Sequence, residues 1–175
     1  MDLINNHFIP ALDEVGVLFD QGKFFLPQLM ASAEAARVGF DTIKRLMPAG
    51  EIADKGKICV ATVKGDIHDI GKNIVRVLLE NYGYTVLDLG KDVPCQLVAD
   101  TAKEHNVKLV GLSALMTTTL GAMEETIQLV KAACPDCKVV VGGAVLTADY
   151  AEKIGADFYA KDAMETVAVA KQIVG

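Results

Sequence analysis

The sequence predicts an α/β fold with one doubly wound, five-stranded parallel sheet, preceded by a short helical cap. Two observations predict this fold. From about residue 57 onward, short apolar runs alternate with amphipathic stretches, which is typical of parallel strands joined by crossover helices. The first 50 or so residues contain no strand candidate and show helical spacing of apolar residues instead. With 175 residues, 51% of them hydrophobic, the chain is long enough to bury a core.

The strands are expected at the five short apolar runs, and the helices between them. The expected strands span residues 57–63, 84–89, 108–114, 138–141 and 156–159. The expected helices span residues 70–82, 94–105 and 118–133, with a last helix from residue 162. Five strand–helix units of this length fit one doubly wound sheet. We therefore expect a single α/β domain over residues 57–175.

Two amphipathic helices are expected before the sheet, as a separate unit over residues 1–50. Apolar residues at positions 8, 12, 15 and 19 predict the first helix, and Gly22 lies where this pattern breaks. Pro27 suits the first turn of the second helix. The apolar stripe of that helix consists of Leu29, Ala33, Ala36, Phe40, Ile43 and Met47. Residues 49–56 are expected to form a linker. Because two helices expose more apolar surface than they can hide from each other, the pair must pack on the α/β domain, a ligand or another chain.

Charge and hydropathy exclude two classes of partner. The formal net charge is −6, from 17 basic and 23 acidic residues, so the chain lacks the basic face that nucleic-acid binding requires. No apolar run approaches the roughly 20 residues that span a bilayer, and the first ten residues do not resemble a signal peptide. We therefore expect a cytoplasmic protein that binds neither nucleic acid nor membrane. Its four cysteines are expected to be free thiols.

The segment from Lys64 to Lys72, KGDIHDIGK, is the part of the chain that most strongly indicates chemistry. It follows the C-terminal end of the first expected strand, and ligands of open α/β sheets bind at that edge. Asp66 and His68 lie two residues apart, so one extended step can turn the carboxylate back toward the imidazole. A carboxylate on one ring nitrogen fixes the tautomer and leaves the other nitrogen free for a metal. His68 is therefore a candidate metal ligand.

Three short motifs, each at the end of an expected strand, carry a family resemblance. The matching residues are Asp66, His68 and Gly71 for D-x-H-x-x-G, Ser113 and Leu115 for S-x-L, and Gly142 and Gly143 for G-G. Residues 72–112 separate the first two motifs, a gap of 41, and residues 116–141 separate the last two, a gap of 26. With these motifs and spacings, the chain resembles the cobalamin-binding domain of methionine synthase and the corrinoid methyltransferase proteins over nearly its whole length.

The resemblance implies a flavodoxin-like domain that binds cobalamin or a related corrinoid, with methylcobalamin in the loaded state. The nucleotide base of the cofactor would be displaced from cobalt and threaded as a tail between the sheet and its helices. His68 would then replace that base as the cobalt ligand. The other residues implied in cofactor binding within the α/β domain are Asp66, Asp69, Ile70, Gly71, Ser113, Leu115, Thr117, Thr119, Gly142 and Gly143.

Several of these residues have a more specific expected role. Ser113 and Thr117 could donate hydroxyl groups to the buried base and its phosphate, and the three glycines suit positions where the backbone approaches a bulky ligand. Thr119 matches the position that hydrogen-bonds the motif aspartate in methionine synthase, where that enzyme has serine. We therefore expect a relay of Thr119, Asp66 and His68, in which protonation of the last two would favour release of the histidine from cobalt.

The expected cap shares in the resemblance. The segment from Phe19 to Leu29 resembles the one that covers the methyl-bearing face in methionine synthase, with Phe19, Leu26 and Leu29 at its apolar contact positions. Such a lid would shield methyl-cobalt from light and water until a partner displaces it. Family caps usually have four helices, and this chain begins at what resembles the third. Either the cap is truncated, or a second copy completes it in a homodimer.

Most of these residues also have a plainer interpretation. Asp66 or, better, Asp69 could cap the helix that follows them. The Gly142–Gly143 pair could be only a tight turn, and the three apolar cap residues could be ordinary core between helices. The C-x-x-C sequence that ends at Cys137 is interpreted as a turn, since no second pair is present.

The predicted function is that of a corrinoid methyl carrier, a non-catalytic subunit without assigned catalytic residues. A substrate-specific methyltransferase would load it from a methylated one-carbon donor, an acceptor methyltransferase would unload it, and a reductive activase would maintain the cobalt. Two alternatives stay open. One is a cobalamin-dependent sensor, which needs an output module, and the other is the small subunit of an adenosylcobalamin mutase, a class without this cap. The sequence does not identify the methyl donor or the acceptor.

Overall fold

The computed structural model describes residues 4–46 and 55–175, and its centre is a five-stranded parallel sheet in the order β2-β1-β3-β4-β5. The strands are β1 (Lys57–Thr62), β2 (Thr85–Asp88), β3 (Leu109–Ser113), β4 (Lys138–Gly142) and β5 (Phe158–Tyr159). The chain enters at β1, adds β2 on one side, and then adds the other strands on the opposite side. The predicted doubly wound sheet is therefore confirmed, and its topological switch point lies between β1 and β3.

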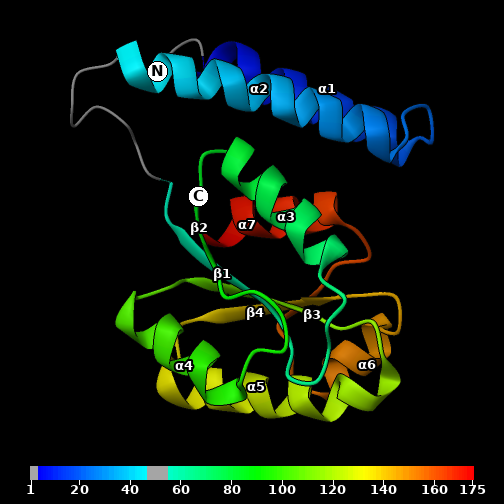
Figure 1. Cartoon of the computed structure of the whole chain (residues 1–175), viewed down its shortest axis with the longest axis vertical. Coiled ribbons are helices and arrows are strands. Elements are labelled where there is room, and N and C mark those ends of the chain that lie inside the picture. The colour runs from blue at the N-terminus through cyan, green and yellow to red at the C-terminus, as the bar shows by residue number, and fades with distance from the viewer. Residues whose placement is uncertain (1–3, 47–54) are drawn as a thin grey trace.

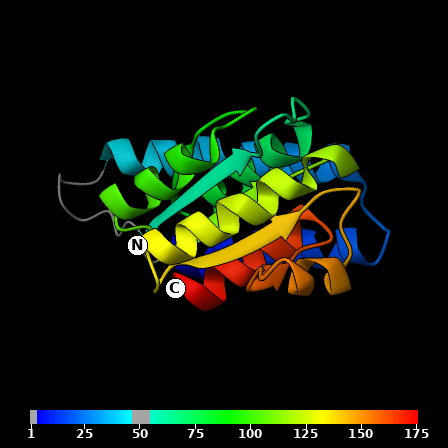
Figure 2. The ribbon, with the colours of Figure 1, turned by 90° about the horizontal axis from the view of Figure 1, so that it is seen from below.

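Helices cover both faces of the sheet (Figure 1). On one face lie α3 (Ile70–Asn81) and α7 (Ala163–Ile173). On the other lie α4 (Cys95–Glu104), α5 (Leu120–Ala133) and α6 (Ala148–Lys153), with a 3-10 turn η2 (Thr117–Thr119) leading into α5. Figure 2 looks onto this second layer and shows β1 and β4 pointing the same way. Because both faces are covered, the middle of the strands is apolar on both faces of the sheet.

β1 illustrates how a continuous apolar run supplies two cores. Every residue of the strand after Lys57 is buried. Ile58 and Val60 pack in the cluster that includes α3 and α7, while Cys59 and Ala61 pack in the cluster that includes α4 and α5. Successive side chains of a strand point to opposite faces of the sheet. The strand therefore joins the two helical layers, and its C-terminal end leads into the motif loop.

The helical cap lies on α3 and α7, on the side away from the sheet (Figure 1). It consists of a π-helical turn η1 (Ile4–Phe8), α1 (Ile9–Asp20) and α2 (Leu26–Leu46). Leu12, Leu29 and Ala33 are buried in the same apolar cluster as residues of α3 and α7. Gly22 has a φ of +68° in the turn between α1 and α2, a conformation that glycine adopts readily. The cap is thus confirmed, and the α/β domain is the surface that covers its apolar stripe.

Most elements lie within two residues of their expected bounds, but one helix was missed and one strand is shorter than expected. The prediction missed α6, because six residues are too few to show helical periodicity. This helix begins after Thr147, whose side chain accepts a hydrogen bond from the Tyr150 N–H at 3.3 Å. β5 is only two residues long, so it is shorter than the predicted strand at residues 156–159.

Some expectations for the cap fall outside the described residues. These are Met47, most of the predicted linker, and the side chains of Phe40 and Ile43. The other three members of the predicted stripe, Leu29, Ala33 and Ala36, are all buried. Within the described part of the chain, no helix combines the length and apolar character needed to cross a membrane.

Candidate functional site

The buried carboxylate of Asp66 organises the loop between β1 and α3. Its Oδ1 accepts hydrogen bonds from the backbone N–H of His68 at 2.9 Å and from His68 Nδ1 at 2.8 Å. Its Oδ2 accepts from the backbone N–H groups of Leu115 at 2.7 Å and Met116 at 3.2 Å. Thr119 Oγ1 lies 3.3 Å from the same oxygen. The predicted contacts of Thr119 with Asp66 and of Asp66 with His68 are therefore present.

These hydrogen bonds determine the protonation of Asp66. Burial alone would raise the pKa of this carboxyl group, but the hydrogen bonds from the backbone of His68 and Leu115, the His68 ring and the Met116 backbone lower its pKa to about 2. Asp66 is therefore ionised at neutral pH and can only accept hydrogen bonds. His68 Nδ1 must then carry the proton. The half-exposed imidazole is left with a free lone pair on Nε2, the atom that a metal would need.

The hydrogen bond from Thr119 to Asp66 is the longest contact of the expected relay. Thr119 Oγ1 is 2.8 Å from the Met116 carbonyl oxygen, a shorter distance than its 3.3 Å to Asp66. A hydroxyl group has one proton to donate, so the two acceptors share it. Thr119 therefore ties Asp66 to the start of α5 without being its main donor.

Neither aspartate caps α3 through its side chain, although Asp69 has the N-cap position that was expected for it. Asp69 occupies the N-cap position of α3, but its side chain makes no capping hydrogen bond, and its backbone, with φ −111° and ψ 5°, is not the extended conformation usual at this position. The carboxylate of Asp66 is fully engaged within the loop and with the segment after β3. Asp66 is therefore committed to orienting His68.

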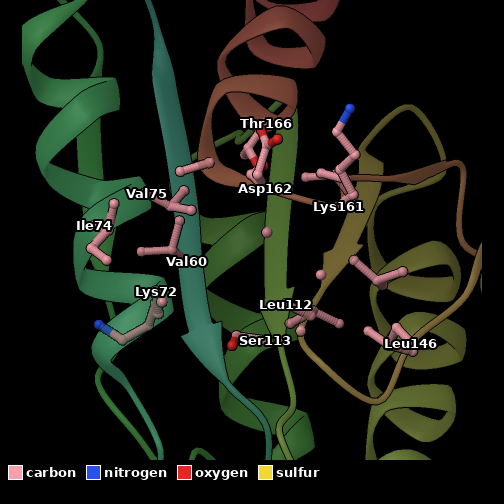
Figure 3. Close-up of a pocket in the computed structure, with 18 of the residues that line it drawn as sticks. Val60, Lys72, Ile74, Val75, Leu112, Ser113, Leu146, Lys161, Asp162 and Thr166 are labelled. Atoms are coloured by element: carbon pink, nitrogen blue, oxygen red, sulfur yellow. The ribbon is translucent and has the colours of Figure 1, made fainter. Parts of the chain in front are cut away.

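A cavity of about 410 Å³ lies between the sheet and the layer of α3 and α7 (Figure 3). Residues of the cap also line it. This volume is in the range of small-molecule sites. The predicted site residues that line it are Phe19, Leu26, Leu29, Gly71, Ser113, Gly142 and Gly143. The other predicted site residues do not line it; these are Asp66, His68, Asp69, Ile70, Leu115, Thr117 and Thr119. Thr117 lies on the exposed start of η2, so its expected contact with the cofactor stays a prediction.

The three motif glycines are glycine for different reasons. A Cβ on Gly143, whose φ is +137°, would lie 1.8 Å from the Ala114 carbonyl oxygen, and one on Gly142 would lie 3.0 Å from the Ala160 carbonyl oxygen. The protein's own backbone therefore requires glycine at position 143 and favours it at 142, which corrects the expectation that a ligand alone explains them. A Cβ on Gly71 would meet no atom within 4 Å. Gly71 alone leaves open space for a ligand at the cavity wall.

Exposed apolar side chains are found on both sides of the His68 loop. Ile67 is 61% exposed, Ile70 is 77% exposed and Leu115 is 42% exposed. Leu115 is tied to the loop by its hydrogen bond to Asp66. Large apolar side chains exposed together indicate a binding surface, here one that would face an apolar ring system. The sequence predicted Ile70 and Leu115 but missed Ile67, although its place next to His68 was a usable signal.

Lys72 lines the cavity and was given no role from the sequence. It is buried, and its Nζ donates to Asp88 Oδ1 at 2.6 Å and to Asn73 Oδ1 at 2.8 Å. Arg76 donates to the other oxygen of Asp88 at 3.2 Å. Burial would raise the pKa of Asp88, but the hydrogen bonds from Lys72 and Gly90 and the two positive charges lower it. Lys72 of the cavity wall is thus paired with Asp88, a contact that only the fold brings about.

The cysteines and other potential ligands do not form a second metal site. Burial raises the pKa of Cys59 and of Cys137 to about 12, so neither is a reactive thiolate. The Cys137 N–H donates to the Cys134 carbonyl oxygen at 2.9 Å, as in a turn. In the described ranges, no three His, Cys, Asp or Glu side chains are gathered to hold a metal ion. A metal at His68 would therefore need other ligands from a cofactor.

Comparisons with known proteins identify the family of the chain. The B12 binding domain family matches residues 56–168, and a second family with the same description matches residues 1–44. Dimethylamine corrinoid protein 1 of Methanosarcina acetivorans is 46% identical over 176 residues, which cover 99% of this chain and 83% of that protein. Trimethylamine corrinoid protein 1 of the same organism is 40% identical over 178 residues, and the match covers 99% of this chain and 82% of that protein.

Two solved structures are similar along almost the whole chain. A cobalamin-binding protein from Desulfitobacterium hafniense has a TM-score of 0.86 and 36% identity, covering 99% of this chain and 82% of that one. A chain of the methanol:cobalamin methyltransferase complex MtaBC from Methanosarcina barkeri has a TM-score of 0.85 and 32% identity. The match covers 99% of this chain and 67% of that chain. The predicted family, fold and cofactor class are confirmed. The chain belongs to the B12-binding corrinoid proteins and is the methyl-carrying subunit of a methyltransferase system.

Proposed function

We propose that the chain binds cobalamin with the cobalt over His68 Nε2 and the nucleotide tail in the cavity between the sheet and α3 and α7. The observation that carries this proposal is the Asp66–His68 pair, which presents a half-exposed imidazole of one tautomer. The cavity and the open space beside Gly71 fit a tail. Ile67, Ile70 and Leu115 supply apolar contacts for the corrin ring.

The protein's part in the reaction is to hold the cofactor and regulate one ligand. Bound cobalamin supplies a cobalt atom that accepts and passes on a methyl group. Asp66 keeps the proton on His68 Nδ1 and so keeps Nε2 available. When His68 Nε2 takes up a proton, it can no longer act as a ligand, so protonation of the pair opposes coordination. Phe19, Leu26 and Leu29 exclude water from the cavity on the cap side.

Methylamines are the proposed methyl donors. The support is sequence similarity, since dimethylamine corrinoid proteins are 43–46% identical to this chain and a trimethylamine corrinoid protein is 40% identical. The cavity itself does not select the donor, because a carrier receives only the methyl group. Specificity therefore belongs to the methyltransferase that docks on the carrier.

The proposed partners are a substrate-specific methyltransferase, an acceptor methyltransferase and a reductive activase, in the cytoplasm. The similar chain in the methanol:cobalamin methyltransferase complex supports the first of these. A homodimer through the cap stays a prediction. It would use the exposed apolar side chains of the cap, which include Val17 at 52%, Phe25 at 64% and Val38 at 55% exposure.

The cobalt ligand can be tested by electron paramagnetic resonance of the cobalt(II) form of the reconstituted protein. Wild-type protein should show splitting of the cobalt signal by one axial nitrogen, and growth on ¹⁵N-labelled histidine should change that splitting. His68→Ala should lose the histidine-dependent change, whereas His105→Ala, an exposed histidine at the end of α4, should keep it. A wild-type spectrum that is insensitive to histidine labelling would contradict the proposal.

A further inference from the structure

We propose that Asp92, in the loop between β2 and α4, is a positioning residue that holds the Asp66–His68 pair in its working geometry. The proposal deepens the proposed function and rests on its assignment of His68 as the cobalt ligand. Asp92 is exposed and does not line the cavity. It therefore acts through the loop and does not touch the cofactor pocket.

Two hydrogen bonds join Asp92 to the residues around Asp66. Asp92 Oδ1 accepts from the Gly65 N–H at 2.7 Å. In the other direction, the Asp92 N–H donates to the Asp66 carbonyl oxygen at 2.9 Å. One bond holds the Lys64–Gly65 peptide, one residue before Asp66, and the other holds the Asp66–Ile67 peptide directly after it. The Asp66 N–H also donates to the Val63 carbonyl oxygen at 3.0 Å, so the backbone around Asp66 cannot rotate far without breaking one of these bonds, and that backbone sets the direction of the carboxylate.

The conformation of Asp92 indicates that its side chain is needed. Its φ is +53°, and among described residues other than glycine only Asn106 shares a positive φ. Aspartate tolerates this left-handed region better than most residues, but glycine adopts it with less strain. A glycine at this position would have no carboxylate to accept the Gly65 N–H. The strained aspartate is explained by that hydrogen bond.

The loop that carries Asp92 is itself anchored to the end of β1. Val63 and Val93 form an isolated parallel bridge, and the Val93 N–H donates to the Thr62 carbonyl oxygen at 3.2 Å. Asp92 is thus placed by a residue pair whose members are both buried. On the opposite side, the Leu115 and Met116 N–H groups hold the Asp66 carboxylate. Asp66 is fixed from two directions, and on the backbone side Asp92 acts together with the Val63 carbonyl oxygen.

The test uses the protein without cofactor, so that it does not depend on cobalt. ¹⁵N NMR measures the fraction of His68 with its proton on Nδ1 and the exchange rate of the Gly65 amide. Asp92→Gly keeps the left-handed backbone and removes the acceptor, and should speed Gly65 exchange about tenfold and lower the Nδ1–H fraction of His68. Asp92→Asn keeps an acceptor oxygen and should restore both to near wild-type values. Asn106→Gly relaxes the other left-handed residue and should change neither.

Two results would overturn the proposal. One is an unchanged Gly65 exchange rate in Asp92→Gly, and the other is faster Gly65 exchange with an unchanged His68 tautomer. In reconstituted protein, Asp92→Gly should also reduce the fraction of cobalt(II) that shows histidine splitting, with rescue by Asp92→Asn. If wild-type cobalt(II) lacks histidine splitting, the proposed function fails, while the NMR result still decides whether Asp92 holds Asp66 and His68.

Discussion

The His68 loop leads into Gly71 of the cavity wall, to which the helical cap also contributes, but different forces hold the loop and the cap. Asp66 is fixed by five donors at defined distances, most of them backbone N–H groups. The cap instead lies on α3 and α7 through apolar side chains. Hydrogen bonds require particular atoms and angles, whereas apolar packing is less directional. The loop therefore suits a fixed ligand, and the cap suits a cover that can move.

One polar cluster modifies this contrast. Asp13 of α1 accepts hydrogen bonds from the Tyr82 hydroxyl at 2.9 Å and from Lys171 Nζ at 2.5 Å. Lys171 Nζ also lies 4.5 Å from the centre of the Tyr82 ring. Tyr82 follows α3 and Lys171 belongs to α7, so this cluster ties the cap to both helices beneath it. It is the most specific link among the described contacts of the cap.

The largest expected effect on stability tests how rigid the sheet edge is at Gly143. Gly143→Ala should lower the free energy of unfolding by more than about 4 kcal/mol, because its Cβ would meet the Ala114 backbone. Gly71→Ala is the matched control and should change stability by less than about 1 kcal/mol, since its Cβ meets nothing. Urea denaturation of the cofactor-free protein measures both. Equal urea midpoints for the two variants would show that the edge is not rigid.

The next effect tests packing in the cap. Leu29→Ala should lower the free energy of unfolding by about 3 kcal/mol, because Leu29 is 1% exposed in the core. Leu26→Ala, at a position that is 41% exposed, should lower it by less than about 1 kcal/mol. The same denaturation experiment compares them. If Leu29→Ala has as small an effect as Leu26→Ala, the cap is not an integral part of the core.

Acid should destabilise the sheet edge through Asp66. The pKa of Asp66 is about 2 in the folded protein, below its usual value of 3.8. Its contribution to the free energy of unfolding is therefore present above pH 4 and is lost as the pH falls toward 2. The loss should be about 2 kcal/mol, at about 1.4 kcal/mol per pKa unit. Denaturation at pH 5 and pH 2.5 measures it. The Asp66→Asn variant should lose less stability over this range, and an identical acid dependence in both proteins would contradict the assignment.

The smallest expected effect concerns the link between cap and body. Asp13→Ala should lower the free energy of unfolding by about 1 kcal/mol, through a half-exposed ion pair and one hydrogen bond. It should also speed proteolytic cleavage within the cap. Glu34→Ala is the control, because Glu34 pairs with Arg37 of the same helix. If both variants are cleaved at the wild-type rate, the cluster does not hold the cap.

The parts of the site that the sequence predicted are those that depend on short spacings. Asp66 and His68 are two residues apart, and their contact is present at 2.8 Å. The Lys72–Asp88 pair was missed, because it joins residues 16 apart on different elements. Thr117 was expected at the ligand on the strength of its hydroxyl. The 3-10 turn that it begins leaves it exposed and outside the cavity lining, so this expectation stays a prediction.

The sequence by itself determined the strand–helix alternation, the sheet edge that carries the motifs, and the pairing of a histidine with a nearby carboxylate. Periodicity and short spacing are local properties, so they can be read along the chain. Only the tertiary structure decided that the Ala114 backbone leaves no room for a side chain at Gly143. It alone also decided that Leu29 is buried while Leu26 is exposed, and that Asp92 accepts a hydrogen bond from the Gly65 N–H. These depend on distances between segments far apart in sequence, which the packing of the whole domain sets.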